Sequence, residues 1–307
     1  MNTYSDMQIS QTVRRASRNE NPLVALESAV ITHGLPYPTN VRLARDLERE
    51  VAATGAVPAT IAVLNGMVKV GLEEQELEEL AQVESPYKVS VRDFGAVLAK
   101  KGSGGTTVAG TLAVADKVSI RVFATGGIGG VHRGSRFDIS ADLPELAKRP
   151  VVVVCAGAKA ILDIASTLEY LETVGVPVIG YKTDEFPAFY SRRSGLPVSA
   201  RAESAKEVVE IARSHWFFGL NSAILVAVPP PRETAIPFRE IDAKITQAIE
   251  EAEAQGIQGQ AVTPFLLERV TELSSGSSLK TNLDLLRNNA RVAAEIALEL
   301  KSSRSDR

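Results

Sequence analysis

Short apolar runs alternate with longer amphipathic segments along most of the chain. The apolar runs are continuous, without regularly spaced polar positions, which is typical of strands buried on both faces of a sheet. Six strands are predicted on this basis, at residues 23–26, 60–64, 122–125, 151–155, 176–181 and 224–228. Strands that alternate with helices predict an α/β protein with a mostly parallel sheet covered by helices on both faces.

The segments between these strands show the spacing of amphipathic helices. Residues 40–54 place apolar side chains on one face, with Asn40 as the expected N-cap and Gly55 as the end. Further helices are predicted at residues 73–82, at 160–173, from the N-cap Thr263 and Pro264 onward, and at 281–300. Without an internal repeat or a low-complexity linker, a single domain over residues 1–307 is expected, with frayed tails at about residues 1–7 and 301–307.

The composition excludes several classes of protein. Hydrophobic residues make up 45% of the 307 residues, which suffices for a large core and excludes disorder outside the ends. The 34 basic and 37 acidic residues give a net charge of -3, so neither nucleic acid nor a membrane is an expected partner. No apolar segment could span a bilayer, and the N-terminus lacks the apolar core of a secretory signal. Because Cys155 is the only cysteine and can form no internal disulfide, the expected location is the cytoplasm.

Two charged residues follow predicted strands that are otherwise apolar. Glu27 comes directly after residues 23–26, and Lys159 follows a strand of four valines and a turn of small residues. Ligands bind outside the carboxyl ends of strands in open parallel sheets, so these side chains are candidates for a general acid or base and for an imine-forming nucleophile. The alternatives are a glutamate that reaches solvent or an arginine, and a lysine that extends from a helix start into water.

Two glycine-rich segments could bring backbone N–H groups close to an anion. The glycine loop, residues 125–134 (TGGIGGVHRG), follows a strand and carries His132 and Arg133 near its end. Residues 102–108 (GSGGTTV) precede a helix of small residues, where N–H groups and hydroxyls could hold a phosphate. Neither is a Walker loop or a clean GxGxxG motif, so a tight turn, a helix start and a structural role for His132 stay open.

The segment FDISADL (residues 137–143) supplies two carboxylates, Asp138 and Asp142. They would share a face if the segment is helical. Oxygen ligands without a cysteine or histidine partner fit Mg²⁺ or Mn²⁺ better than Zn²⁺. Helix capping by Asp138 or Ser140 is the alternative. Together with Glu27 and Lys159, this pattern indicates lyase or glycosyl chemistry on a small phosphorylated metabolite.

Longer strings of residues carry a more specific match. From about residue 8 to about residue 300, the sequence resembles the pseudouridine-5'-phosphate glycosidases, also called the indigoidine synthase A family. The matching strings lie at residues 25–28 (ALES), 33–38 (HGLPYP), 55–62 (GAVPATIA), 125–134, 137–143, 154–159 (VCAGAK), 170–177 (YLETVGVP), 263–267 (TPFLL) and 278–282 (SLKTN). Their length and number make chance similarity a poor explanation.

The resemblance implies a three-layer α/β/α sandwich around a mostly parallel, mixed sheet, assembled as a homotrimer. It implies reversible cleavage of pseudouridine 5'-phosphate to uracil and ribose 5-phosphate with a divalent metal, typically Mn²⁺. The matching motifs imply that Lys159 forms an imine with the sugar, that Glu27 donates protons and that Asp138 is the metal residue. Substrate contacts are expected from Lys88, Val108, His132, Ser140, Ala141, Asp142 and Asn282.

The implied chemistry is consistent with these residue types. Pseudouridine joins C1' of ribose to a carbon of uracil, which has no lone pair to protonate, so the usual glycosidase route is closed. A lysine imine with the opened sugar supplies an electron sink beside that bond, and Lys88 would favour a neutral Lys159 if the two amines lie close. Two alternatives stay open: an imine-forming aldolase or lyase on another sugar phosphate, and a non-catalytic nucleotide-binding module.

Overall fold

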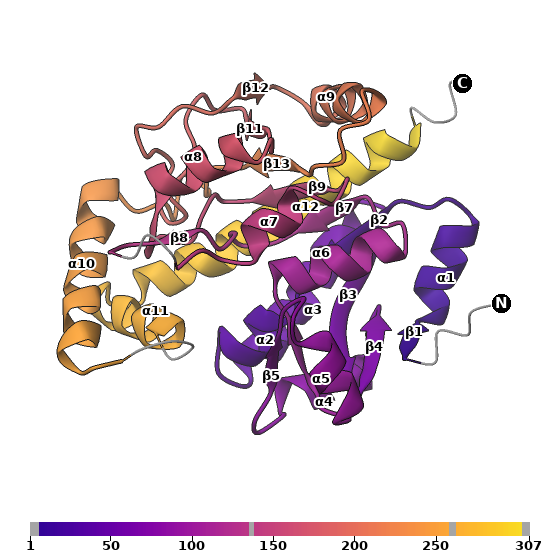
Figure 1. Cartoon of the computed structure of the whole chain (residues 1–307), viewed down its shortest axis with the longest axis horizontal. Helices are drawn as coiled ribbons and strands as arrows, with labels where there is room; N and C mark the ends of the chain where they lie inside the picture. Colours follow the sequence, from indigo (N-terminus) through magenta and orange to yellow (C-terminus); the bar gives the residue numbers. More distant parts are fainter. Residues whose placement is uncertain (1–5, 135–137, 258–261, 303–307) are drawn as a thin grey trace.

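The computed structural model describes residues 6–134, 138–257 and 262–302. Within them, a mixed sheet of eleven strands runs through the molecule (Figure 1). Its strands are β1 (Met7–Ile9), β2 (Leu23–Leu26), β3 (Val57–Leu64), β4 (Met67–Val70), β5 (Tyr87–Val89), β6 (Gly104–Thr106), β7 (Val122–Ala124), β9 (Val152–Cys155), β11 (Val178–Tyr181), β12 (Ala200–Ala202) and β13 (Ile224–Ala227). A separate antiparallel pair joins β8 (Val131–His132) to β10 (Leu162–Asp163).

The order of the strands is β1-β4-β3-β2-β7-β9-β13-β11-β12, with β6 beside β3 and β5 beside β6. The central run from β3 to β12 is parallel at every pairing. Antiparallel pairing occurs where β3 meets β4 and β6. The sheet is therefore mixed and mostly parallel, as the continuous apolar strands and the family resemblance predicted.

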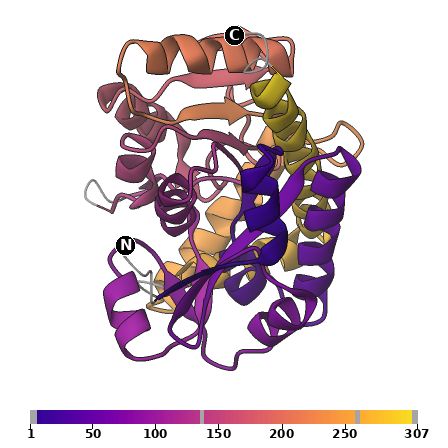
Figure 2. The same ribbon diagram turned by 90° about the vertical axis from the view of Figure 1, so that its right-hand side faces the viewer.

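Helices cover the sheet on both sides. They are α1 (Gln11–Arg18), α2 (Ala29–His33), α3 (Thr39–Ala53), α4 (Glu74–Ala81), α5 (Phe94–Ala99), α6 (Val108–Lys117), α7 (Asp142–Leu146), α8 (Ile164–Thr173), α9 (Ala205–Phe217), α10 (Phe238–Ala254), α11 (Val262–Leu273) and α12 (Ser277–Ser302). The long helix α12 contacts β2, β7 and β9 and packs between α3 and α9, whereas α6 packs on β2 and β3 and against α7. Figure 1 shows α6 and α7 in front of the strands and α12 behind them, and Figure 2 shows α12, in yellow, along one side of the sheet. The predicted α/β/α layering is confirmed.

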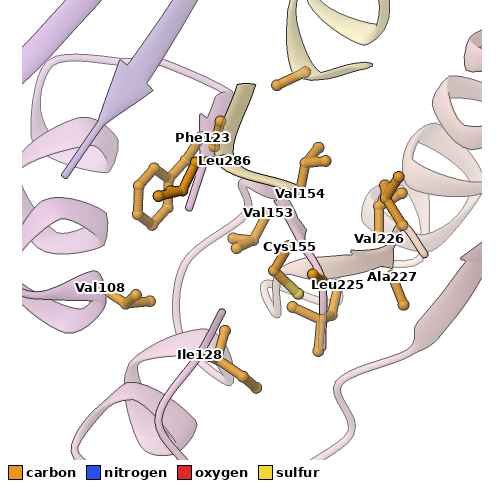
Figure 3. Packing of buried hydrophobic residues seen from close by; sticks show 14 of the residues in the cluster. Val108, Phe123, Ile128, Val153, Val154, Cys155, Leu225, Val226, Ala227 and Leu286 are labelled. Atoms are coloured by element: carbon orange, nitrogen blue, oxygen red, sulfur yellow. The ribbon is translucent and has the colours of Figure 1, made fainter. Parts of the chain in front are cut away.

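The core surrounds the neighbouring strands β7, β9, β13 and β11, in which every residue is buried. Figure 3 shows Val153, Cys155 and Leu225 packed side by side, with Phe123 and Ile128 in the same cluster. Burial raises the pKa of the Cys155 thiol to about 12, so this cysteine stays protonated at neutral pH. Its role is packing, and it is excluded as a nucleophile.

All six predicted strands are present, and their bounds lie within three residues of the predicted ones. The sequence pattern missed β1, β4, β5, β6 and β12 of the large sheet, and β8 and β10 of the separate pair, because none of them is longer than four residues and such short strands need no long apolar run. No helix in the described part of the chain is both long enough and apolar enough to cross a membrane.

Several predicted helix boundaries were wrong. Asn40 is not the N-cap of α3: it lies inside the helix, is buried, and donates through Nδ2 to Ile31 O at 2.9 Å and Ala81 O at 3.0 Å. The helix predicted at 160–173 begins only at Ile164, because the preceding residues pair with β8. The helix expected to start at Pro264, after Thr263 as N-cap, begins two residues earlier, at Val262.

The chain ends are also more ordered than predicted where the structure describes them. Met7 belongs to β1 and pairs with Val68, so the expected frayed segment 1–7 is wrong at its last residue. Lys301 and Ser302 continue α12. Residues 1–5 and 303–307 lie outside the described residues.

Candidate active site

Three neighbouring parallel strands bring the predicted catalytic side chains to one edge of the sheet. The strands β2, β7 and β9 are adjacent, and their carboxyl ends lead to Glu27, Thr125 and Lys159. In an open α/β sheet, ligands bind at this edge. The apolar strands therefore fix the position of these side chains, while the loops that follow decide which groups face a ligand.

A cavity with two lobes opens at this edge, and Glu27, Lys88 and Lys159 line both lobes. The empty volumes of the lobes are about 570 and 630 Å³, a size that suits a small ligand. The first lobe is largely apolar and is completed by side chains that include His33, Phe189, Asn282 and Leu286. The second lobe is more polar and includes Val108, His132, Ser140, Ala141 and Asp142. Each residue that we expect to contact substrate thus lines one of the two lobes.

Glu27 is held at the floor of the cavity with only 8% of its surface exposed. The hydroxyl of Thr125 donates a hydrogen bond to its Oε1. Burial raises the pKa of Glu27, and the Lys159 ammonium and the Thr125 hydroxyl oppose that rise only in part. A carboxyl group with a raised pKa at a ligand edge is suited to donate a proton.

The two lysines face the same space, and the charge of Lys159 acts on Lys88. Burial lowers the pKa of Lys88, and the nearby Lys159 lowers it further, whereas Asp142 and Glu27 act in the opposite direction. The sequence prediction made the repulsion between these amines conditional on their proximity, and the structure meets that condition. Two amines that share one cavity favour the loss of a proton from the pair.

The glycine loop runs alongside the segment that carries Lys159. Ile128 N donates to Gly157 O and accepts, through its own carbonyl, the N–H of Lys159, both at 3.0 Å. Gly129 must be a glycine because a Cβ atom there would collide with the Ser140 side chain. The loop therefore positions Lys159 through its backbone, which favours the structural alternative over an anion cradle.

Asp142 organises the second lobe instead of lying free within it. Its Oδ1 accepts from Ala109 N at 2.9 Å, and its Oδ2 accepts from Gly129 N at 2.7 Å. The carboxylate is buried, with 6% exposed, and it ties the first turn of α6 to the glycine loop. Both oxygens already hold backbone donors, so Asp142 keeps the walls of the lobe together.

Asp138 differs from Asp142 in its exposure and in the groups around its carboxylate. Its side chain is 65% exposed, and its Oδ2 lies 3.9 Å from His132 Nδ1. The two aspartates would share a face only if their segment were helical, and that condition is not met, because Ile139 forms a bridge to Val131 and α7 begins only at Asp142. In residues 6–134, 138–257 and 262–302, no three His, Cys, Asp or Glu side chains cluster as metal ligands. An exposed carboxylate beside an imidazole nevertheless fits a Mn²⁺ or Mg²⁺ ion that is held mainly through its waters.

The structure places two residues at the site that sequence reasoning missed, His33 and Asn289, and gives Arg133 a role other than the anion contact considered for it. His33 lines the first lobe, and burial together with Lys88 lowers its pKa, so the imidazole is neutral at pH 7. Arg133 braces the chain after Lys159 by donating to Ala160 O and Leu162 O at 3.2 and 3.3 Å. Asn289 on α12 donates to Thr125 O at 2.9 Å. Asn289 interrupts the apolar spacing of residues 281–300, and this interruption was a sequence signal for a buried polar contact.

The chain matches the family described as indigoidine synthase A like protein over residues 12–299. It belongs to this family. A pseudouridine-5'-phosphate glycosidase of Geobacillus kaustophilus is 54% identical over 293 residues, which cover 95% of this chain and 97% of that protein. The Escherichia coli K12 protein of the same name is 52% identical over 296 residues, covering 95% of each chain. As a member of this enzyme family, the chain is an enzyme.

Solved structures of the indigoidine synthase A family share the fold. The prealnumycin C-glycosynthase AlnA, solved in complex with ribulose 5-phosphate, superposes with a TM-score of 0.91 at 38% identity, covering 98% of this chain and 99% of that one. An indigoidine synthase A-like protein from Thermotoga maritima superposes with a TM-score of 0.88 at 37% identity, covering 96% of each chain. The backbone that carries the cavity is therefore shared with both of these proteins.

Proposed function

We propose that this enzyme reversibly cleaves the C–C glycosidic bond of pseudouridine 5'-phosphate, giving uracil and ribose 5-phosphate. The observation that carries the proposal is the convergence of Lys159 and Glu27 on one cavity at the carboxyl edge of the sheet, with Lys88 beside them. The names of relatives at 52 and 54% identity support the substrate. The ribulose 5-phosphate bound to AlnA supports a pentose phosphate in the cavity.

The first step opens the sugar. The Nζ atom of Lys159 forms a bond to C1', and the bond between C1' and the ring oxygen breaks. The electron pair of that bond goes to the ring oxygen, which takes a proton from Glu27. The lysine nitrogen, now bonded to C1', gives a proton back to Glu27 and so regains its lone pair. This covalent step replaces one difficult cleavage by easier ones.

The second step breaks the carbon–carbon bond. The lone pair of the lysine nitrogen forms a C=N bond to C1', and the bond from C1' to uracil breaks. Its electron pair goes to the uracil carbon, which takes a proton, and uracil departs. Water then hydrolyses the imine, which releases ribose 5-phosphate and restores Lys159.

Glu27 is the proton donor of both steps in this proposal. Its raised pKa, caused chiefly by burial, lets it carry a proton to the ring oxygen and to the departing carbon. Lys88 lies within the same cavity and is suited to bind the phosphate. The repulsion between the two ammonium groups also favours the loss of a proton from one of them. The apolar first lobe would take the uracil ring, and the polar second lobe the sugar phosphate.

A divalent ion completes the proposal at the exposed edge of the site. Asp138, with His132 beside it, would hold Mn²⁺ through one carboxylate and water. Such an ion supplies positive charge that stabilises nearby oxygen anions. The homotrimer, the cytoplasmic location and the role in pseudouridine breakdown stay predictions.

The decisive test is turnover of pseudouridine 5'-phosphate by wild-type protein and by Lys159→Ala, with free uracil measured by chromatography. We expect Lys159→Ala to lose on the order of 10,000-fold or more of kcat, as removal of a covalent nucleophile does. Borohydride should trap ribose 5-phosphate on wild-type protein and not on the variant. Lys206→Ala, at a 74% exposed lysine on α9, is the folded control. Near-normal uracil release by Lys159→Ala would refute the imine mechanism.

A second candidate function is C-glycoside formation with an aglycone other than uracil. The observation that favours it is the similarity to AlnA, a C-glycosynthase. Incubating the protein with ribose 5-phosphate and either uracil or other carbon nucleophiles separates the two. Product formation only with uracil supports the first proposal, whereas product formation without any dependence on uracil supports the second.

A further inference from the structure

A chain of two hydrogen bonds links the long helix α12 to the proposed proton donor. Asn289 Nδ2 donates to the carbonyl oxygen of Thr125 at 2.9 Å, and the hydroxyl of Thr125 donates to Glu27 Oε1. The exposed fractions of Asn289, Thr125 and Glu27 are 0%, 2% and 8%. The three groups come from different parts of the sequence and meet only in the folded protein.

Packing alone does not explain an asparagine at this position of α12. Its neighbours on the buried face of the helix include Leu285, Leu286, Ala290 and Ala293, all of them apolar. The Oδ1 atom of Asn289 is buried and has no hydrogen-bond partner among the described residues. A buried polar atom without a partner costs about 1–3 kcal/mol, so an apolar residue would suit the helix better. What the amide contributes is its donation to Thr125 O, with a longer contact to Gly126 O at 3.4 Å.

Thr125 has a comparably specific relation to Glu27. Its hydroxyl is the hydrogen-bond donor to that carboxyl group within the described part of the chain. The charged groups that act on Glu27 are Lys159 after β9, Asp142 on α7 and Lys88 on β5. The imidazoles of His33 on α2 and His132 on β8 line the same two lobes.

We propose that Asn289 and Thr125 are positioning residues that hold the carboxyl group of Glu27 in place for proton transfer. The proposal rests on the proposed function for the role of Glu27, and it adds two residues that act through Glu27 without touching the reacting atoms. Asn289 anchors the start of the glycine loop to α12, and the loop presents the Thr125 hydroxyl to the carboxyl group.

The hydrogen bond from Thr125 changes the pKa of Glu27 in a direction that an experiment can measure. It favours the ionised form of Glu27 and therefore lowers the pKa of that group against the effect of burial. If Glu27 must be protonated to act, activity falls as pH rises through its pKa. Removing the hydroxyl should raise the pKa and move this falling limb to higher pH.

The test compares Thr125→Val, which keeps the shape and removes the hydroxyl, with Thr125→Ser, which keeps the hydroxyl. We expect Thr125→Val to lower kcat about tenfold with little change in KM, as loss of a hydrogen bond at the transition state would. Its falling pH limb should move to higher pH, and Thr125→Ser should restore the wild-type limb. Thr111→Val removes another fully buried hydroxyl, bonded to Thr106 at 2.9 Å, and should leave the limb in place.

Asn289→Leu tests the second link. We expect a shift of the pH limb in the same direction as for Thr125→Val, and the double variant should shift no further than Thr125→Val alone, because both changes act through one hydrogen bond. Additive shifts, or an unmoved limb in Asn289→Leu, would remove Asn289 from the proposal. An unmoved limb in Thr125→Val would overturn the proposal as a whole.

A readout without turnover separates this proposal from the proposed function. Carboxyl ¹³C NMR titration of glutamate-labelled protein, with Glu27→Gln to assign the signal, gives the pKa of Glu27 directly. A higher pKa in Thr125→Val supports the positioning role even if wild-type protein releases no uracil. Normal uracil release together with an unchanged Glu27 titration in Thr125→Val would refute the positioning role and leave the function intact.

Discussion

The buried floor of the cavity and its exposed edge hold carboxyl groups in different ways. On the floor, Glu27 receives the Thr125 hydroxyl, and Asp142 receives two backbone N–H groups. At the edge, Asp138 keeps a 65% exposed side chain whose described neighbour is His132 at 3.9 Å. A group on the floor has one orientation, whereas a group at the edge is free to meet an ion or water.

The carboxylates on the floor therefore shape the site, whereas the carboxylate at the edge can bind a metal ion. Burying a carboxylate is costly unless hydrogen bonds compensate, so Asp142 needs both of its donors. Glu27 has one donor and lies against two lysines, so its charge state remains adjustable. Among the described residues no hydrogen bond occupies the Asp138 carboxylate, so its oxygen atoms are available to a metal. Substitution of Glu27, Asp142 and Asp138 should therefore have effects of decreasing size.

Glu27→Gln should have the largest effect on turnover. A glutamine keeps the acceptor for Thr125 but cannot donate an acidic proton, so kcat should fall about 100- to 10,000-fold. Because the folded pKa of Glu27 is raised above 4.5, its contribution to stability is present at low pH and is lost as pH rises through the folded value. Glu27→Gln should therefore melt at a higher temperature than wild type at pH 7. Uracil release and thermal unfolding measure the two effects, and a lower melting temperature would contradict the account of burial.

Asp142→Asn should mainly affect stability. An amide can replace one acceptor, but its NH₂ group faces the second backbone N–H, so one charge-assisted bond is lost. We expect a loss of about 1–3 kcal/mol in the free energy of unfolding, measured by urea denaturation. Lower kcat should accompany it, because α6 and the glycine loop lose their tie. Unchanged stability with only a raised KM would instead make Asp142 a direct substrate contact, as the family resemblance implied.

Asp138→Asn should have the smallest effect on stability, within about 0.5 kcal/mol, because its side chain is exposed. It should abolish Mn²⁺ binding measured by titration calorimetry, and with it the response of turnover to chelation. Asp163→Asn is not a suitable control, since Asp163 caps α8 at Ser166 N, whereas Asp184→Asn changes another exposed aspartate, which lines neither lobe of the cavity. If Asp138→Asn still bound Mn²⁺ tightly, the metal site would lie elsewhere in the protein.

The sequence predicted much of this architecture because its main strands are continuous apolar runs, a pattern that few alternatives share. It also singled out Glu27 and Lys159, since a charge directly after a buried strand is conspicuous. It left the arrangement of residues 138–142 open, because two aspartates at helical spacing share a face only if the segment is helical. Pairing of Ile139 with Val131 prevents that helix, and such a contact is invisible to local spacing.

The sequence by itself determined the class of fold, the strands that form its centre and the chemical groups available at their ends. Local periodicity and composition suffice for these, because they follow from which residues must leave water. The tertiary structure decided which of those groups meet. Only folding brings Asn289 to Thr125, Thr125 to Glu27, and Lys88 to Lys159. Contacts between residues far apart in sequence depend on the packing of helices and loops around the sheet, which no local pattern encodes.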